Sequence, residues 1–235
     1  MNSLNKVEKL NGVLNKVLNL VLLNILWVAG TLIGLVVLGV GPSTLAVLSI
    51  IREWFRGNDD LPIFKTFVKN YKSYFKDGII LSLIYGVVGV ILIVDFAYIT
   101  SWEFKVFFGV MLFLYFLSLI YVFPIMVHYD LKNLKEKIKY SFLIGFSYLQ
   151  HTLILFVAIG AIAFAVAQIL PALFTLYGAS FPLFLIMWNA INVFKIIEKS
   201  FEEEEEEKKS NKGSWKTQTQ RGNSYKEQQA LETKQ

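Results

Sequence analysis

Residues 17–51 read VLNLVLLNILWVAGTLIGLVVLGVGPSTLAVLSII and contain no charged side chain. Placing a charge in the hydrocarbon of a bilayer costs at least about 2.5 kcal/mol, so a charge-free run of this length indicates membrane insertion. An α-helix rises about 1.5 Å per residue, and roughly 20 residues cross a hydrocarbon core of about 30 Å. The run is longer than one crossing and therefore predicts two helices.

The sequence GVGP at residues 39–42 divides this run. A first helix is expected over residues 18–38, and the proline suits the first turn of a second helix over residues 42–55. At roughly 21 Å this second helix is short. It spans the bilayer only if Arg52 extends its charged end to the interface and Trp54 lies in the headgroup layer.

Three further charge-free windows follow, at residues 78–94, 106–129 and 140–194. The first two fit one crossing each, whereas the third is too long for one helix and contains Pro171, Gly178 and Pro182. We expect it to form two helices, over residues 142–170 and 181–194. Hydrophobic residues make up 55% of the chain and its mean hydropathy is +0.52, which exceeds the apolar usage of soluble domains. The predicted fold is an all-α bundle of six transmembrane helices, the second one short.

The distribution of lysine and arginine sets the expected orientation. With six crossings and the N-terminus inside, 22 of the 23 basic residues lie on the cytoplasmic side and only Lys105 lies outside. A five-crossing rival, with residues 42–55 on the membrane surface and the N-terminus outside, leaves 19 inside and 4 outside. Cytoplasmic loops carry the excess of positive charge, so the six-crossing topology is favoured and both termini are expected in the cytoplasm.

Two segments on the expected cytoplasmic side have a different character from the apolar runs. Residues 64–75 place aromatic residues at helical spacing among Lys65, Lys69 and Lys72, which predicts a basic amphipathic helix in the membrane interface. Beyond Lys199, a run of glutamates and a polar segment cannot bury enough apolar surface to fold. The chain is therefore expected to divide into a polytopic membrane domain, residues 1–199, and a disordered cytoplasmic tail, residues 200–235.

Polar amides within the apolar runs are costly in hydrocarbon unless they find partners. They are Asn19, Asn24, Gln168, Asn189 and Asn192. Interhelical hydrogen bonds are the ordinary explanation, but Asn189 and Asn192, three residues apart, also share a face that would suit a polar pocket. Gly30 and Gly34 form a pair of small residues, four apart, that allows helices to approach closely.

The sequence contains none of the catalytic, metal-binding or nucleotide-binding motifs that we considered. There is no cysteine, no nucleotide-binding glycine loop, and no metalloprotease or serine-hydrolase motif. We therefore expect no catalytic residue, no cofactor and no metal, and we do not expect an enzyme. The formal charge of +5 comes from short basic clusters beside long apolar runs, which suits anionic lipid rather than nucleic acid as a partner.

The sequence GPSTLAVL at residues 41–48, followed by Arg52, Trp54 and Phe55, resembles the YesL-like family of bacterial integral membrane proteins. The resemblance extends over roughly residues 10–195 and leaves the tail outside. The family is a domain of unknown function, commonly found in Gram-positive bacteria beside carbohydrate-uptake and sensing genes. The resemblance implies a location in the bacterial cell membrane and a role linked to sugar uptake. The candidate functional or packing residues are Gly41, Pro42, Arg52, Trp54, Asn189 and Asn192.

Two functional hypotheses remain open at this point. The first is an accessory or regulatory membrane protein that assists carbohydrate uptake, with the lipid bilayer and the permease or sensor components of a sugar importer as partners. The second is a small transporter or channel that acts by itself and uses the amides. The two differ in one structural feature, because only the second requires the amides to line one water-accessible cavity.

Overall fold

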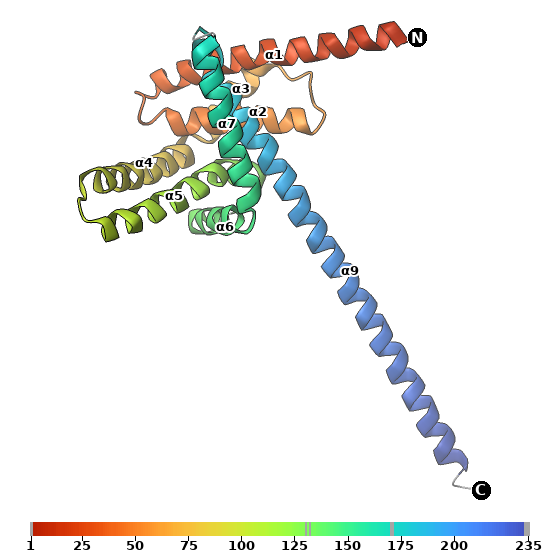
Figure 1. Ribbon diagram of the computed structural model, residues 1–235. Helices are drawn as coiled ribbons and strands as arrows, with labels where there is room; N and C mark the ends of the chain where they lie inside the picture. The colour runs from red at the N-terminus through yellow and green to blue at the C-terminus, as the bar shows by residue number, and fades with distance from the viewer. Residues whose placement is uncertain (1, 130, 132, 170–171, 233–235) are drawn as a thin grey trace. The chain divides into compact units, whose positions relative to one another are not determined.

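The computed structural model describes residues 2–129, 131, 133–169 and 172–232, and every regular element in this part of the chain is an α-helix. The elements form two compact units, Met1–Ile191 and Asn192–Gln235. In chain order the helices are α1 (Asn2–Ile33), α2 (Val40–Phe55), α3 (Ile63–Ser73), α4 (Phe75–Tyr98), α5 (Trp102–His128), α6 (Leu134–Ser147), α7 (Leu149–Ile169), α8 (Ala172–Tyr177) and α9 (Ser180–Glu232) (Figure 1).

Five of the described helices are long and apolar enough to cross a membrane. They are α1 from Leu14 to Ile33, α4, α5, α7, and α9 from Ser180 to Lys208. The outward side chains of α1 beyond Leu14 and of α4, α5 and α7 are apolar along most of their length, as expected where the surrounding solvent is hydrocarbon, whereas those of α9 are mostly charged from Lys195 onward. The prediction of a multi-pass, all-α membrane protein is confirmed.

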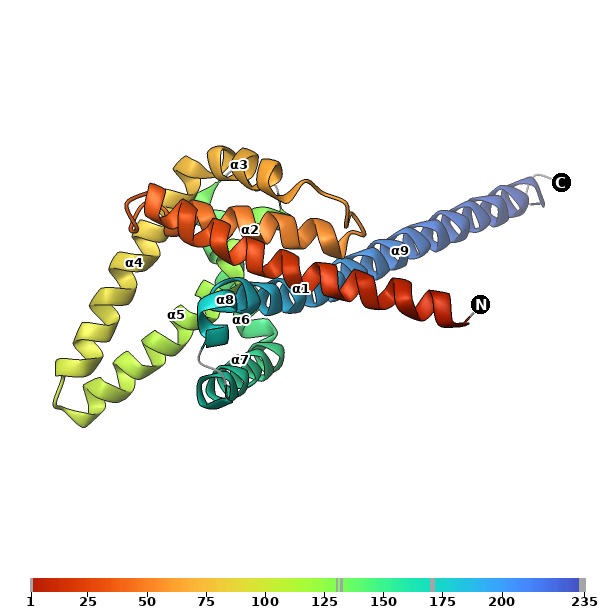
Figure 2. The ribbon, with the colours of Figure 1, turned by 90° about the horizontal axis from the view of Figure 1, so that it is seen from above.

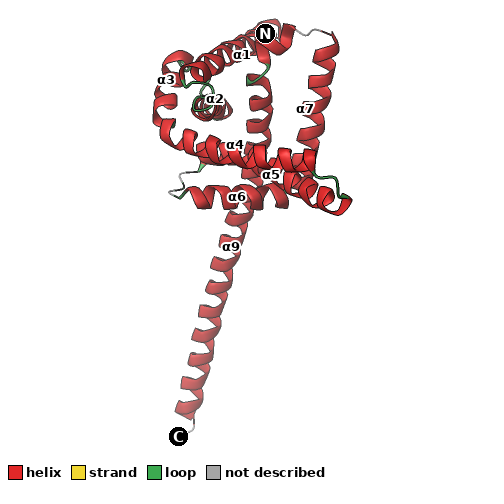
Figure 3. Cartoon of the chain, turned by 90° about the vertical axis from the view of Figure 1, so that its left-hand side faces the viewer, coloured by secondary structure: helices red, strands yellow, loops and turns green. Residues whose placement is uncertain are grey.

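Helix α2 is absent from that set, although it lies where the short second helix was predicted. It has 16 residues, and every side chain from Gly41 to Ile51 is buried. It packs against α1, α3, α4 and α5 and is seen end-on among α1, α3 and α4 in Figure 3. Trp54 is only 5% exposed, so its side chain packs against protein rather than facing lipid headgroups. Its indole is enclosed by protein because α2 forms the centre of the main apolar cluster.

Small residues allow the neighbouring helices to approach α2 closely. A Cβ atom on Gly41 would overlap the carbonyl group of Gly78 on α4, so the two backbones touch there. A Cβ on Gly30 of α1 would lie 2.6 Å from the Ser43 Oγ of α2. Close approach at glycine is the usual way for helices to gain packing contacts in a membrane, and the expectation for Gly30 is confirmed.

The turn between α1 and α2 starts earlier than predicted. Helix α1 ends at Ile33 rather than at residue 38, and the Val36 N–H donates to the Thr31 carbonyl at 2.8 Å. Leu35 and Val36 then adopt φ values of 55° and 64°. This left-handed conformation is unfavourable for a β-branched residue such as Val36, so the turn carries local strain that its hydrogen bonds and packing offset.

Helix α3 is amphipathic as predicted, but its apolar face is divided between two environments. Phe67 is buried against the protein, and the Tyr71 hydroxyl donates to the Gly30 carbonyl at 2.9 Å. Burial raises the pKa of the Tyr71 hydroxyl. Phe64 stays exposed, as do Lys65 and the other α3 lysines, Lys69 and Lys72. Much of the face expected in the membrane interface therefore packs on α1 and α2 instead.

Helices α4 and α5 form an antiparallel pair, visible in Figures 1 and 2, and α6 packs along α5. The helix predicted over residues 142–170 is wrong, because the chain breaks at Tyr148 into α6 and α7. Two contacts keep α6 on α5. Gly145 lies against the Leu117 carbonyl, and Ser141 shares a hydrogen bond of 2.7 Å with Ser118.

The last helix is longer than the predicted residues 181–194. Helix α9 continues to Glu232, so the described part of the tail is helical where disorder was expected. Glutamate, lysine and glutamine favour helices, and four-residue spacing pairs opposite charges. Lys199 pairs with Glu203 and Lys208 with Glu204, each at 3.5 Å. The division into a membrane domain and a separate tail stays a prediction.

Candidate functional site

The first buried polar group lies where α4, α5 and α6 meet. Ser118 on α5 shares hydrogen bonds with the Tyr85 hydroxyl of α4 at 2.5 Å and with Ser141 of α6 at 2.7 Å. Ser141 also donates to the Ile138 carbonyl at 2.7 Å. We call Tyr85, Ser118 and Ser141 the Ser118 cluster. All three residues are buried, and their hydroxyl groups satisfy one another.

A second buried polar group lies on α5 less than one helical turn beyond Ser118. It connects α5 with α7 and α9. The Tyr121 hydroxyl shares a hydrogen bond of 3.1 Å with Thr152 on α7 and accepts one of 3.2 Å from the Asn189 Nδ2 on α9. Thr152 also donates to the Tyr148 carbonyl at 3.2 Å. We call Tyr121, Thr152 and Asn189 the Tyr121 cluster. Only Asn189 of these six residues was expected from the sequence to need a partner, although Ser118 and Tyr121 are three residues apart and share a helix face.

Asn24 ties α1 to the turn between α8 and α9. Its Nδ2 donates to the Thr175 carbonyl at 2.9 Å, and its Oδ1 accepts from the Ala179 N–H at 3.0 Å and the Ser180 N–H at 3.4 Å. One side chain therefore satisfies three backbone groups of a segment that is distant in the sequence. Two of these are N–H groups at the start of α9, which need an acceptor from outside the helix.

The predicted amides do not come together. Asn189 belongs to the Tyr121 cluster and Asn24 to the α8–α9 turn, while Gln168 is exposed. Asn192 is half-buried in the second compact unit, and Asn19 is half-buried on α1. Hydrogen bonds to other segments account for Asn24 and Asn189.

The candidate residues around α2 are occupied by packing and hydrogen bonding. Pro42 lies in the first turn of α2, where a Cβ on Gly78 would come within 2.9 Å of its Cα. The Arg52 Nη2 donates to the His128 carbonyl at the end of α5, at 3.3 Å. This bond places the guanidinium at the last turn of a helix, where positive charge is favourable. Gly41, Pro42, Arg52 and Trp54 thus all contact the helices that enclose α2.

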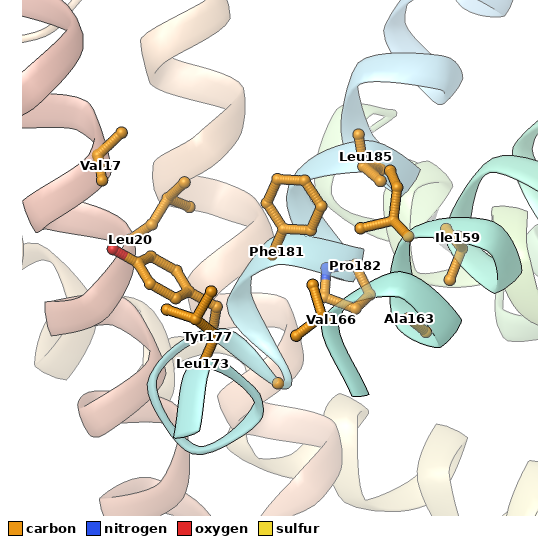
Figure 4. A pocket seen from close by; sticks show the side chains of 12 residues that line it. Val17, Leu20, Ile159, Ala163, Val166, Leu173, Tyr177, Phe181, Pro182 and Leu185 are labelled. Atoms are coloured by element: carbon orange, nitrogen blue, oxygen red, sulfur yellow. The ribbon is translucent and has the colours of Figure 1, made fainter. Parts of the chain in front are cut away.

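A cavity of about 390 Å³ lies among α1, α7 and the start of α9. Figure 4 shows Val17 and Leu20 on one side, Ala163 and Val166 on the other, and Phe181 between them. Of all its lining residues only Tyr177 carries a polar side-chain atom. None of the five amides lines it. In the described residues no group of three or more histidines or carboxylates is placed to hold a metal ion.

Comparisons with known proteins give a family match and three relatives. The family described as "Protein of unknown function, DUF624" matches residues 20–96, which cover the end of α1 from residue 20, all of α2 and α3, and nearly all of α4. No solved structure matches the chain.

The three relatives are uncharacterized proteins of Bacillus subtilis (strain 168). YteU is 36% identical over 67% of this chain and 72% of its own length. YesL is 32% identical over 83% of this chain and 94% of its own length. YesV is 33% identical over 75% of this chain and 86% of its own length.

Proposed function

The chain belongs to the DUF624 family of YesL-like proteins, and from this membership we propose that it is a non-enzymatic accessory or regulatory membrane protein linked to bacterial carbohydrate uptake. The link to carbohydrate rests on the resemblance to the YesL-like family. The accessory role rests on one structural observation, which concerns the polar groups inside the membrane helices.

Most of those polar groups are used within the protein, whereas the buried hydroxyls of Thr31, Ser43 and Ser180 have no hydrogen-bond partner among the described residues. The Ser118 cluster, the Tyr121 cluster and Asn24 pair with one another or with backbone groups, and the cavity beside α7 is apolar. A transporter of saccharides needs hydroxyl and amide groups that face a solvated site, because sugars are recognised through hydrogen bonds. The arrangement supports a protein that works by contact with partners rather than by passing a polar solute.

The surface best suited to such contact is the exposed face of α3. Lys65, Lys69 and Lys72 lie in solvent, while Phe67 and Tyr71 on the opposite side hold the helix to the protein. A change to the lysines therefore removes charge without removing packing. We propose that this face contacts permease or sensor components of a sugar importer.

Affinity capture from cells should recover those components, and replacing Lys65, Lys69 and Lys72 by glutamine should reduce recovery severalfold. Lys135→Gln with Lys139→Gln on α6 is the matched control, since both side chains are exposed and basic. Purified protein in liposomes should carry no sugar. Saccharide flux that stops in an Asn189→Ala, Asn192→Ala variant would replace the accessory role with a transporter. Equal recovery by all variants would exclude the α3 face as the contact.

We also propose that α2 is a sixth crossing and that both termini lie in the cytoplasm. The 22 basic residues assigned to the cytoplasm support this topology, as does the burial of α2, which does not lie on the protein surface. A salt bridge of 3.0 Å between Lys16 and Asp59 also supports it. It brings the loop after α2 back to the start of the α1 span, as a returning helix requires.

Contacts near the α1–α2 turn limit how the helices can be oriented in the six-crossing topology. The Tyr71–Gly30 hydrogen bond and the approach of Gly78 to Gly41 bring the end of α3 and the start of α4 to the α1–α2 turn. Helix α3 therefore runs back along α1 and α2 for about 16 Å. Its exposed lysines must stay in water, so six crossings require the α1–α3 layer to be strongly tilted from the membrane normal.

Cysteine labelling in intact cells separates the two topologies, because the native chain has no cysteine. Asn15→Cys should be protected from a membrane-impermeant thiol reagent if α1 starts in the cytoplasm. Ser101→Cys in the α4–α5 loop is the control for labelling, and Asn133→Cys before α6 is the control for protection; all three positions are exposed. External labelling of position 15 with correct controls would favour five crossings and an outside N-terminus.

A further inference from the structure

Nine of the twelve residues that line the cavity beside α7 belong to candidate membrane spans, and the other three, Leu173, Tyr177 and Gly178, lie in α8 or directly after it. Val17 and Leu20 belong to the α1 span, Ala163 and Val166 to the α7 span, and Phe181 to the α9 span. Exposed apolar side chains flank it on the same helices, since Leu18 is 65% and Phe164 is 69% exposed. The cavity is therefore continuous with a surface that contacts lipid chains rather than water.

The chemistry of the lining excludes a polar occupant. Tyr177 supplies one hydroxyl, and no charged or amide side chain enters the cavity. Asn24 lies close in the fold, but it is engaged with Thr175, Ala179 and Ser180, and it thereby holds the turn that carries Tyr177. A headgroup placed inside would lose its hydrogen bonds to water without replacement, which is strongly unfavourable.

The size of the cavity suits one flexible hydrocarbon chain. A volume of about 390 Å³ lies within the range of small-molecule sites, whereas an α-helix of a partner is about 10 Å across with its side chains and needs a longer and wider groove. An empty apolar cavity of this size would forfeit dispersion contacts along its whole lining. Lipid chains are present at molar excess in the surrounding bilayer.

We propose that this cavity is a binding site for one acyl chain of a membrane phospholipid, whose headgroup stays outside at the membrane surface. The lipid fills the space between α1 and α7, both of which contact α8. The site goes beyond the proposed accessory role and does not depend on it. It predicts one phospholipid that remains on the purified protein more firmly than the lipids around it.

The test is native mass spectrometry of the full chain in mild detergent, titrated with dioleoyl phosphatidylglycerol. The wild type should retain one lipid after delipidating washes. Ala163→Phe fills the cavity and displaces several methylene groups, each of which changes affinity about fourfold, so lipid binding should fall at least about tenfold. Ala165→Phe is the matched control, because this α7 residue is exposed and lies outside the lining. It should bind as the wild type does.

A second measurement uses only the wild type and therefore does not depend on the folding of a variant. Affinity should rise steeply from dihexanoyl to dioleoyl phosphatidylglycerol if the acyl chain is bound in the cavity, and it should stay nearly constant if only the headgroup is recognised. Equal binding by Ala163→Phe and the wild type, an equal loss in Ala165→Phe, or no dependence on chain length would each overturn the proposal.

Discussion

Replacing Gly41 by alanine is expected to lower the melting temperature of the detergent-solubilised protein by roughly 6–12 °C, which corresponds to about 3 kcal/mol for a chain of this size. The added Cβ would overlap the Gly78 carbonyl oxygen and lie 2.7 Å from its carbon and 2.9 Å from the Ser82 Cβ. Two of these obstacles are backbone atoms, which cannot rotate away. Helices α2 and α4 must therefore separate, and the separation loosens the centre of the apolar cluster.

The control for Gly41 is another helical glycine. Gly86→Ala adds the same methyl group to α4, where no atom lies within 4 Å of the new Cβ. Alanine favours a helix over glycine by about 1 kcal/mol, so this variant should be neutral or slightly more stable. Thermal unfolding of both variants, followed by circular dichroism or by size-exclusion chromatography after heating, gives the comparison. Equal melting temperatures would mean that α2 and α4 do not cross at Gly41 and Gly78.

Replacing Trp54 by alanine is expected to reduce the free energy of unfolding by about 3–5 kcal/mol, the usual loss for a large buried aromatic side chain. Trp54 is 5% exposed and belongs to the cluster around α2. An interfacial tryptophan, as the sequence suggested, would lose far less, because its ring would leave a headgroup layer that adapts to the change. The size of the effect therefore distinguishes a core position from an interfacial one.

Trp102→Ala supplies the matched control, since this tryptophan at the start of α5 is 77% exposed. Its removal should change stability by less than about 1 kcal/mol. Unfolding in a denaturant series, with intrinsic fluorescence of the remaining tryptophans as the signal, measures both variants. A similar small loss for Trp54 and Trp102 would return Trp54 to the membrane interface and would contradict the buried position of α2.

Local signals in the sequence explain which helix boundaries could be predicted. The proline at residue 42 and the glycines before it mark the start of α2 within two residues, and the charge-free windows locate α4 and α5. The break at Tyr148 has no such signal, because neither proline nor glycine stands there. Just before the break, Gly145 and Ser141 pack against Leu117 and Ser118 of α5, which are far from them in the chain.

The polar clusters could be predicted only in part from the sequence, because their members lie far apart in the chain. An amide in an apolar run is conspicuous, so Asn24 and Asn189 were identified as residues in need of partners. Serine and tyrosine are common in membrane helices, so a single one does not indicate a polar cluster. Their spacing on α5 places Ser118 and Tyr121 on one face, but their partners Ser141 and Thr152 lie on two other helices.

The sequence by itself determined that this chain is a helical membrane protein, because long runs without charge are stable only in hydrocarbon or in a protein interior. It did not distinguish those two environments, since both favour the same apolar side chains and a helix that is apolar all round has no preferred face. Only the tertiary structure decided that α2 is enclosed by α1, α3, α4 and α5, and that Trp54 is a core residue. The burial of α2 depends on which helices can approach it closely. Small residues such as Gly41 on α2 and Gly78 on α4 allow this approach, although they lie far apart in the sequence.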